Sequence, residues 1–174
     1  LGYYARARNL YKCAVYVTEN MSGIFPQKES ELLKLPGVGA YTAAAIAAIA
    51  FAERAVVVDA NIERLVARLF AIDTPLPKGK CEIREAMDAI TPSHAAGDFA
   101  QACMDIGATI CTSKSPKCDI CPVQQQCAAY AMGDMERFPV KAPKKAKPVR
   151  RARFFWIEQQ DRIFGCLSGR KNGY

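Results

Sequence analysis

Four cysteines lie within 17 residues of the chain, and this group restricts the possible fold more than any other feature. They have the spacing C-x6-C-x2-C-x5-C and are Cys111, Cys118, Cys121 and Cys127. Four thiolates so close in sequence can surround one compact site for a soft metal or an iron–sulfur cluster. Only one pair is short, whereas zinc knuckles usually combine two short pairs, so the spacing favours a cluster. A tetrathiolate zinc site and four unrelated buried thiols remain as alternatives.

The overall composition is that of a folded chain. It has 174 residues, 51% of them hydrophobic, which suffices for the core of one domain, or of one domain with part of another. A wholly disordered or collagen-like chain is thereby excluded. The longest apolar run, residues 42–52, has 11 residues, whereas a membrane span needs roughly 20. The chain starts at Leu1 without a basic-then-apolar leader, so we expect a cytoplasmic protein, with no membrane partner, and a fragment of a longer chain.

Residues 1–130 have a helical pattern, which predicts an all-α domain. Alanine, the best helix former, fills most of residues 40–52, and another helix is expected over residues 99–110. The clearest amphipathic helix has apolar residues at i, i+3, i+4 and i+7, namely Ile62, Leu65, Val66 and Leu69. This spacing places three charged residues on its other faces, namely Glu63, Arg64 and Arg68.

Beyond residue 130 the composition changes twice. Residues 131–152 are rich in proline and lysine and predict a basic linker. Eight lysines and arginines face two acidic residues between positions 131 and 153, so most of the net charge of +7 lies there. Such a charge suits a polyanionic partner as well as a solvated linker. Residues 153–158 and 162–167 then predict two strands and a tight turn, the start of a second domain over residues 153–174 that is cut off.

A glycine turn separates two of the predicted helices, at Gly37, Val38 and Gly39. Two glycines one residue apart allow a sharp turn with positive φ. They also leave consecutive backbone amides free at the start of the following helix, where a DNA phosphate can be held without any reading of sequence. An ordinary helix–helix turn is the alternative explanation.

A second candidate site begins at Asp59, which follows three valines and precedes the amphipathic helix. Both Asp59 and Asn61 are well suited to cap the N-terminus of that helix, and capping alone could explain either residue. A carboxylate at an apolar rim can also stabilise an adjacent cation, such as the oxocarbenium ion that forms when a glycosidic bond breaks. The sequence leaves both interpretations open.

Taken together, the glycine turn, Asp59 and the four cysteines resemble the helix–hairpin–helix DNA glycosylases of the endonuclease III superfamily. Within that superfamily, residues 1–10 (LGYYARARNL) and 99–108 (FAQACMDIGA) are most similar to the MutY-type adenine DNA glycosylases. The resemblance runs from Leu1 to about Pro148. It implies an all-helical body with a 4Fe–4S cluster held by the four clustered cysteines.

The resemblance also implies an activity in base excision repair. These enzymes act on duplex DNA in which adenine is mispaired with 8-oxoguanine or guanine, flip the adenine out of the stack, and hydrolyse its glycosidic bond. We expect a monomer. The family's residue roles transfer to this chain as follows: Asp59 as the catalytic carboxylate, Tyr41 and Asn61 as active-site helpers, Tyr3 as the aromatic wedge in the duplex, and Gly37, Val38 and Gly39 as the phosphate-binding hairpin.

Tyr41 also predicts a subclass. Bifunctional members of the superfamily have a lysine at this position that attacks the sugar and forms a Schiff base. A phenol cannot form that imine, so we expect base excision without efficient strand cleavage.

Three departures from the family pattern accompany the resemblance. Ala60 replaces a glycine next to Asp59, which would be strained if the backbone there needed positive φ. The family's general acid, a glutamate on a helix before residues 1–10, has no counterpart, so we expect the chain alone to be a poor catalyst. Only the first hairpin of the family's Nudix-like mismatch-recognition domain is present. A related glycosylase for another lesion and a non-catalytic iron–sulfur module that binds DNA are the alternatives.

Overall fold

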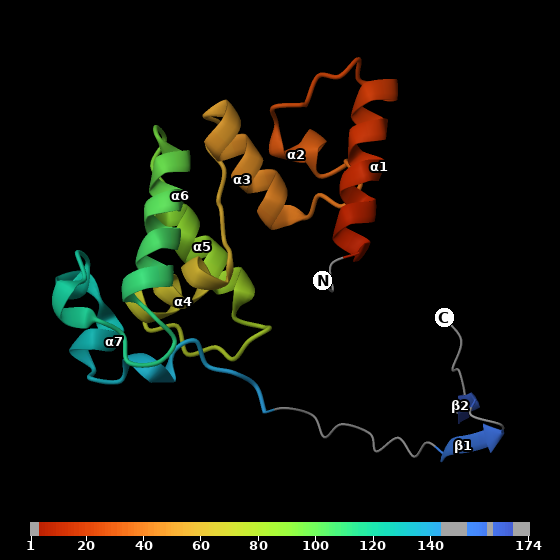
Figure 1. Ribbon diagram of the computed structural model, residues 1–174. Helices are drawn as coiled ribbons and strands as arrows, with labels where there is room; N and C mark the ends of the chain where they lie inside the picture. The colour runs from red at the N-terminus through yellow and green to blue at the C-terminus, as the bar shows by residue number, and fades with distance from the viewer. Residues whose placement is uncertain (1–3, 144–152, 160–161, 169–174) are drawn as a thin grey trace. The chain divides into compact units, whose positions relative to one another are not determined.

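The computed structural model describes residues 4–143, 153–159 and 162–168 (Figure 1). The chain divides into two compact units, Leu1–Ala142 and Pro143–Tyr174. The longer helices are α1 (Tyr4–Asn20), α3 (Ala40–Phe51), α4 (Ala60–Leu69), α5 (Lys80–Ile90) and α6 (Ala96–Asp105). The short helical elements are α2 (Glu29–Leu32), η1 (Ile106–Ile110), η2 (Cys118–Ile120), η3 (Gln124–Gln126), α7 (Ala128–Ala131) and η4 (Met135–Arg137). The strands are β1 (Arg153–Gln159) and β2 (Arg162–Ser168).

Helix α4 packs against several elements of the helical unit. It contacts α5, α6, α7 and η1. Its predicted apolar face is confirmed, because Ile62, Leu65 and Val66 are buried. Since α4 begins directly after Asp59, the packing of this one helix decides where the candidate catalytic carboxylate lies.

The alanine-rich helix α3 packs closely against α6. Its buried face consists of alanines, and Gly97 of α6 lies so near that a Cβ on it would come within 2.5 Å of the Ala48 carbonyl oxygen. Small side chains on both helices let the two backbones approach each other. The alanine run therefore serves helix packing, and within the described residues no helix is long and apolar enough to cross a membrane.

The helix predicted over residues 99–110 is present but changes form partway. α6 ends at Asp105 and continues as η1, a π-helical turn that leads directly into Cys111. Gly107 in this turn is buried against α4, because a Cβ on it would come within 2.7 Å of Asn61 Cβ. The chain thus enters the cysteine loop from an element pressed against the first turn of α4.

The helical unit extends further than the composition suggested. Residues 131–142 were expected to belong to the basic linker, yet Phe138 is only 2% exposed and packs in the core. The Leu76 amide donates to the Val140 carbonyl (2.9 Å), and the Ala142 amide donates to the Leu76 carbonyl (3.3 Å). The buried Phe138 side chain and these backbone hydrogen bonds attach residues 131–142 to the helical unit. The lysines and prolines of the segment gave it the composition of a linker.

The second unit contains the predicted strand pair. β1 and β2 are antiparallel, in a register that pairs Arg153 with Ser168 and Gln159 with Arg162. The predicted fold class, an all-α body followed by the beginning of a β-containing part, is therefore confirmed.

Candidate catalytic and iron–sulfur sites

A buried extended segment leads into the candidate catalytic residue. Ala55, Val56 and Val57 lie in the core between α3 and α4. Apolar side chains on consecutive positions suit a segment that is enclosed on all sides. Asp59 therefore lies where the chain leaves the core, at the rim of an apolar region.

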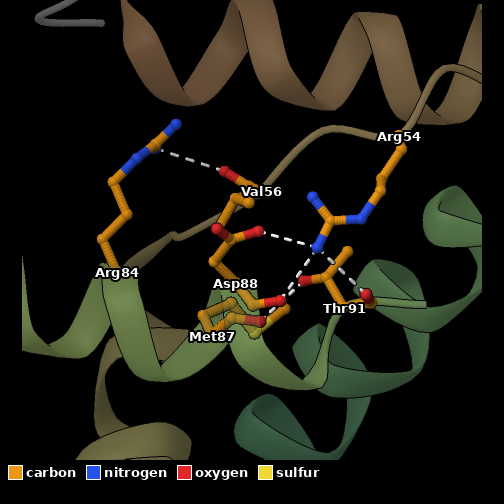
Figure 2. A network of polar contacts seen from close by, with 6 residues as sticks. All are labelled: Arg54, Val56, Arg84, Met87, Asp88 and Thr91. Atoms are coloured by element: carbon orange, nitrogen blue, oxygen red, sulfur yellow. Dashed lines mark hydrogen bonds and ion pairs between the residues drawn. The ribbon is translucent and has the colours of Figure 1, made fainter. Parts of the chain in front are cut away.

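Two arginines attach this segment to α5, as Figure 2 shows. Arg84 of α5 donates to the Val56 carbonyl (3.3 Å). Arg54 donates to the carbonyls of Asp88 (2.9 Å) and Thr91 (3.2 Å), and pairs with the Asp88 carboxylate (2.7 Å). A cation at the carbonyl end of α5 is also favourably placed in the helix dipole. Both sides of the segment are thereby tied to one helix just before the chain reaches the candidate site.

Asp59 caps α4 with both carboxylate oxygens engaged. Its Oδ1 accepts hydrogen bonds from the backbone amides of Asn61 (2.9 Å) and Ile62 (2.7 Å). Its Oδ2 accepts from the side-chain Nδ2 of Asn61 (3.1 Å). The negative charge lies at the positive end of the helix dipole, which stabilises it. The side chain is half-buried and fixed in orientation, and Oδ2, which accepts only one hydrogen bond, still has a lone pair for a further partner.

Ala60 does not strain this corner. It is the first residue of α4. The described non-glycine residues with positive φ are Ser22, Ala52, Ala71, Ala95 and Ser115. Ala60 is not among them, so the replacement of the family's glycine is harmless to the backbone.

The other predicted helper has a different hydrogen-bond partner. Tyr41 is the second residue of α3, is 45% exposed, and directs its hydroxyl to the Met104 Sδ (3.7 Å). No hydrogen bond links Tyr41 to Asp59 or Asn61 in the part of the chain that the structure describes. The structure therefore brings Asp59 and Asn61 together and leaves Tyr41 on the surface of α3. Tyr3, the predicted wedge, lies outside the described residues.

The glycine turn has the geometry that two glycines permit. Gly37 has φ +77°, and a Cβ on it would come within 2.5 Å of Asn9 Cβ in α1. The Val38 amide donates to the Leu35 carbonyl (3.1 Å) and closes the turn. Gly39 is the N-cap of α3, makes no side-chain cap, and has nothing within 4 Å of its Cβ position. No side chain caps the first amides of α3, so they remain available as donors for a backbone anion site.

A chain of hydrogen bonds joins the carboxylate to the cysteine loop. Arg64 donates from Nη2 to the Asn61 Oδ1 (3.0 Å), while Asn61 donates to Asp59 (3.1 Å). Arg64 also donates from Nε to the Cys111 carbonyl (2.7 Å), and makes a further short bond to the Gly107 carbonyl. The candidate catalytic residue and the first clustered cysteine are thus connected through two side chains on α4.

The four clustered cysteines line one pocket. Burial raises the pKa of Cys118, the like charges of Cys111, Cys121 and Cys127 raise it further, and Arg68 lowers it. The other three sulfurs therefore lie close enough to Cys118 to act on its charge.

This donor set fits an iron–sulfur cluster. Thiolates are the usual ligands of such clusters, and four of them around one cavity meet the requirement. Among the described residues, no three His, Cys, Asp or Glu side chains lie together at the spacing of a site for a single ion. A 4Fe–4S cluster is larger than one ion and separates its thiolates more widely, so the arrangement is compatible with it.

Arg68 is the functional residue that sequence analysis missed. Its helical spacing placed it away from the apolar face of α4, yet it is only 1% exposed. It donates to backbone carbonyls at the start of the cysteine loop and beyond its end, namely those of Cys111, Thr112, Ser113, Met135 and Phe138. The spacing of Asn61, Arg64 and Arg68, at i, i+3 and i+7, was a usable signal, because it defines a second, polar stripe on the same helix.

Two family models match separate parts of this chain. The helix-hairpin-helix motif matches residues 21–49, which include the glycine turn. The iron–sulfur binding domain of endonuclease III matches residues 111–127, the span of the four cysteines. The chain therefore carries a 4Fe–4S cluster domain, and the predicted cofactor is confirmed.

Curated relatives share one name. The adenine DNA glycosylase of Buchnera aphidicola subsp. Acyrthosiphon pisum (strain APS) is 37% identical over 94% of this chain and 47% of its own length. Those of Arabidopsis thaliana and Homo sapiens are 44% and 38% identical, each over 85% of this chain, and over 24% and 28% of their own lengths. The chain spans about half the length of the bacterial relatives that it matches.

Solved structures give the same fold. A thermostable thymine-DNA glycosylase matches with a TM-score of 0.66 and 33% identity, over 74% of this chain and 59% of that one. A non-covalent endonuclease III–DNA complex matches with a TM-score of 0.62 and 28% identity over the same shares. The chain has the helix–hairpin–helix DNA glycosylase fold of the endonuclease III superfamily, and the curated relatives named above are adenine DNA glycosylases.

Proposed function

We propose that this chain is the glycosylase part of an adenine DNA glycosylase, which removes adenine mispaired with 8-oxoguanine or guanine. The observation that carries the proposal is the Asp59 carboxylate, which three N–H groups fix at the rim of an apolar region. The name shared by the curated relatives supports adenine as the base removed. Because the glycosidic bond is inaccessible inside the duplex, the adenine must first be flipped out of the stack.

Asp59 acts on the sugar in this proposal. Departure of adenine leaves positive charge on the sugar ring, and a fixed carboxylate stabilises that charge without having to reorganise. Asn61 is the orienting residue, because it donates to Asp59 and is itself bonded by Arg64. Tyr41 takes the place of the lysine nucleophile of bifunctional members, so no Schiff base forms and the DNA strand is not cleaved.

Binding to DNA depends on the glycine turn and on charge. The open amides at the start of α3, after Gly37, Val38 and Gly39, would hold a backbone phosphate. Tyr3 would enter the duplex as a wedge. The basic residues between 131 and 153 would add salt-dependent attraction to the phosphates. We expect a monomer that acts in the cytoplasm, on the nucleoid if the source is bacterial, which size-exclusion chromatography and a salt titration of duplex binding would test.

The cysteines serve the cluster in this proposal. Cys111, Cys118, Cys121 and Cys127 are its ligands. When bound, the cluster supplies a rigid, redox-capable cross-link of its loop. The hydrogen bonds from Arg64 to the Cys111 carbonyl and to Asn61 would then connect the order of that loop to the position of Asp59.

The test is base release by the protein loaded with iron and sulfide, with the family's glutamate-bearing helix restored before residue 1. Duplexes with adenine opposite 8-oxoguanine, adenine opposite guanine, and thymine opposite guanine are compared, and strand cleavage is followed on an abasic duplex. We expect adenine release without cleavage, reduced on the order of 100-fold by Asp59→Asn and unchanged by Asp73→Asn, an exposed aspartate.

Each other outcome has a definite meaning. Full activity of Asp59→Asn would remove Asp59 from the catalytic role. Preference for thymine opposite guanine would favour the activity named for the similar thymine-DNA glycosylase. Tight duplex binding without release of any base would favour the non-catalytic iron–sulfur module.

A further inference from the structure

The buried guanidinium of Arg68 has no anionic partner among the described residues. The ion pairs in this part of the chain are Arg54–Asp88, Lys80–Glu63 and Arg84–Glu29. Arg68 is the largest of the side chains that are less than 2% exposed. A charge taken out of water is costly unless something compensates it. This residue therefore needs a physical explanation.

Hydrogen bonding alone does not supply the compensation. Arg68 donates from Nη1 to the Thr112 carbonyl (2.7 Å) and from Nε to the Met135 carbonyl (2.8 Å), with longer bonds to other carbonyls. Carbonyl oxygens satisfy the N–H groups but are neutral, so the net charge remains. The remaining contact is different in kind, because Nη1 also donates to the Sγ of Cys111 (3.3 Å). That sulfur is one of the four lining the cluster cavity.

We propose that Arg68 is the counter-charge of the iron–sulfur cluster. Four thiolate ligands bring negative charge to a half-buried loop, and the guanidinium lies against the first of them. Positive charge and N–H···S bonds at a ligand sulfur stabilise the electron-richer state of a cluster and so raise its reduction potential. Arg68 would thereby adjust both the potential of the cluster and its retention. The inference rests on the iron–sulfur domain and is independent of adenine excision.

A purely mechanical role makes a different prediction. As a tie between α4 and the two ends of the loop, Arg68 would affect how much cluster is retained. It would not affect the potential of the molecules that still hold one. The charge of residue 68 therefore has to be separated from its hydrogen bonds.

The experiment uses the whole chain, reconstituted anaerobically with iron and sulfide. Arg68→Gln removes the charge and keeps one amide donor, whereas Arg68→Lys keeps the charge and removes the planar fork. Arg54→Gln is the matched control. Arg54 also donates to carbonyls, but these belong to Asp88 and Thr91, at the C-terminal end of α5. Iron per chain, visible absorbance, circular dichroism and the reduction potential by film voltammetry are measured.

We expect Arg68→Gln to hold less than half the iron of the parent and to have a more negative potential. Arg68→Lys should retain more iron than Arg68→Gln, at a potential near that of the parent, and Arg54→Gln should match the parent in both. An unchanged potential in loaded Arg68→Gln would overturn the proposal. If Arg68→Gln does not fold, Arg68→Lys provides the test. A folded Arg68→Lys that holds no cluster would overturn the proposal. So would an Arg68→Lys that holds as much iron as the parent but has a shifted reduction potential.

Discussion

The two ends of α4 hold their polar groups in different ways. At the N-terminal end, Asp59 accepts hydrogen bonds from Asn61 and Ile62, two and three residues away in sequence. At the C-terminal end, Arg68 donates to carbonyls 43 to 70 residues away. The first end is a local structure that α4 forms by itself, whereas the second exists only when the cysteine loop has been brought to it. Damage to the cluster should therefore disorder the cysteine loop more than it disorders the cap at Asp59.

Removal of a cluster ligand is the largest change that this comparison predicts. Cys121→Ala should abolish cluster retention, because three thiolates leave one iron without its protein ligand. The loop of residues 111–127 should then lose order, while the cap at Asp59 should keep it. Hydrogen exchange of the two segments, with iron analysis, measures this, and Cys81→Ala, an exposed cysteine in α5, is the control. Equal loss of protection at both ends of α4 would show that the cap depends on the cluster.

Substitution of Asp59 separates capping from charge at the other end. Asparagine is as good an N-cap as aspartate, whereas alanine costs about 1 kcal/mol of stability. Asp59→Asn and Asp59→Ala should both lose catalysis, on the order of 100-fold, because both lack the negative charge. Only Asp59→Ala should unfold at lower urea concentration. Equal stability of the two variants would contradict the capping geometry.

Gly107 tests the contact between the first turn of α4 and η1, the element that leads into the cysteine loop. A methyl group there would come within 2.7 Å of Asn61 Cβ and 2.8 Å of the Asn61 carbonyl oxygen, so η1 and α4 would have to separate. We expect Gly107→Ala to destabilise the unit by about 1–3 kcal/mol in urea unfolding. Gly39→Ala is the matched control, since its Cβ meets nothing within 4 Å, and it should change stability by less than about 0.5 kcal/mol. A neutral Gly107→Ala would mean that this interface can relax.

The smallest expected effect is at Ala60. Because Ala60 begins a helix without positive φ, restoring the family's glycine should relieve no strain. Ala60→Gly should lower the stability by up to about 1 kcal/mol through the greater freedom of the unfolded chain. Thermal unfolding measures the change, and a stabilised variant would reveal strain at this corner.

The predictability of individual residues follows the same division. The cap at Asp59, the turn at Gly37 and the apolar face of α4 depend on neighbours a few residues away, and spacing indicated each of them. Phe138 was assigned to a linker because the lysines and prolines around it dominate the composition, yet it packs in the core. The loop contacts of Arg68 were not visible at all, since no local rule identifies carbonyl partners so far along the chain.

By itself, the sequence determined the helical class and the set of four thiols and offered Asp59 as one candidate cap, because periodicity, ligand chemistry and capping act over short spans of chain. Only the tertiary structure decided that Arg68 is buried, that the segment to residue 142 belongs to the helical unit, and that Arg64 connects Asn61 to Cys111. Those arrangements depend on which distant backbone carbonyls come together when α4 packs against the cysteine loop. A helix face that is polar in sequence can then be buried, because its charges find acceptors that only folding supplies.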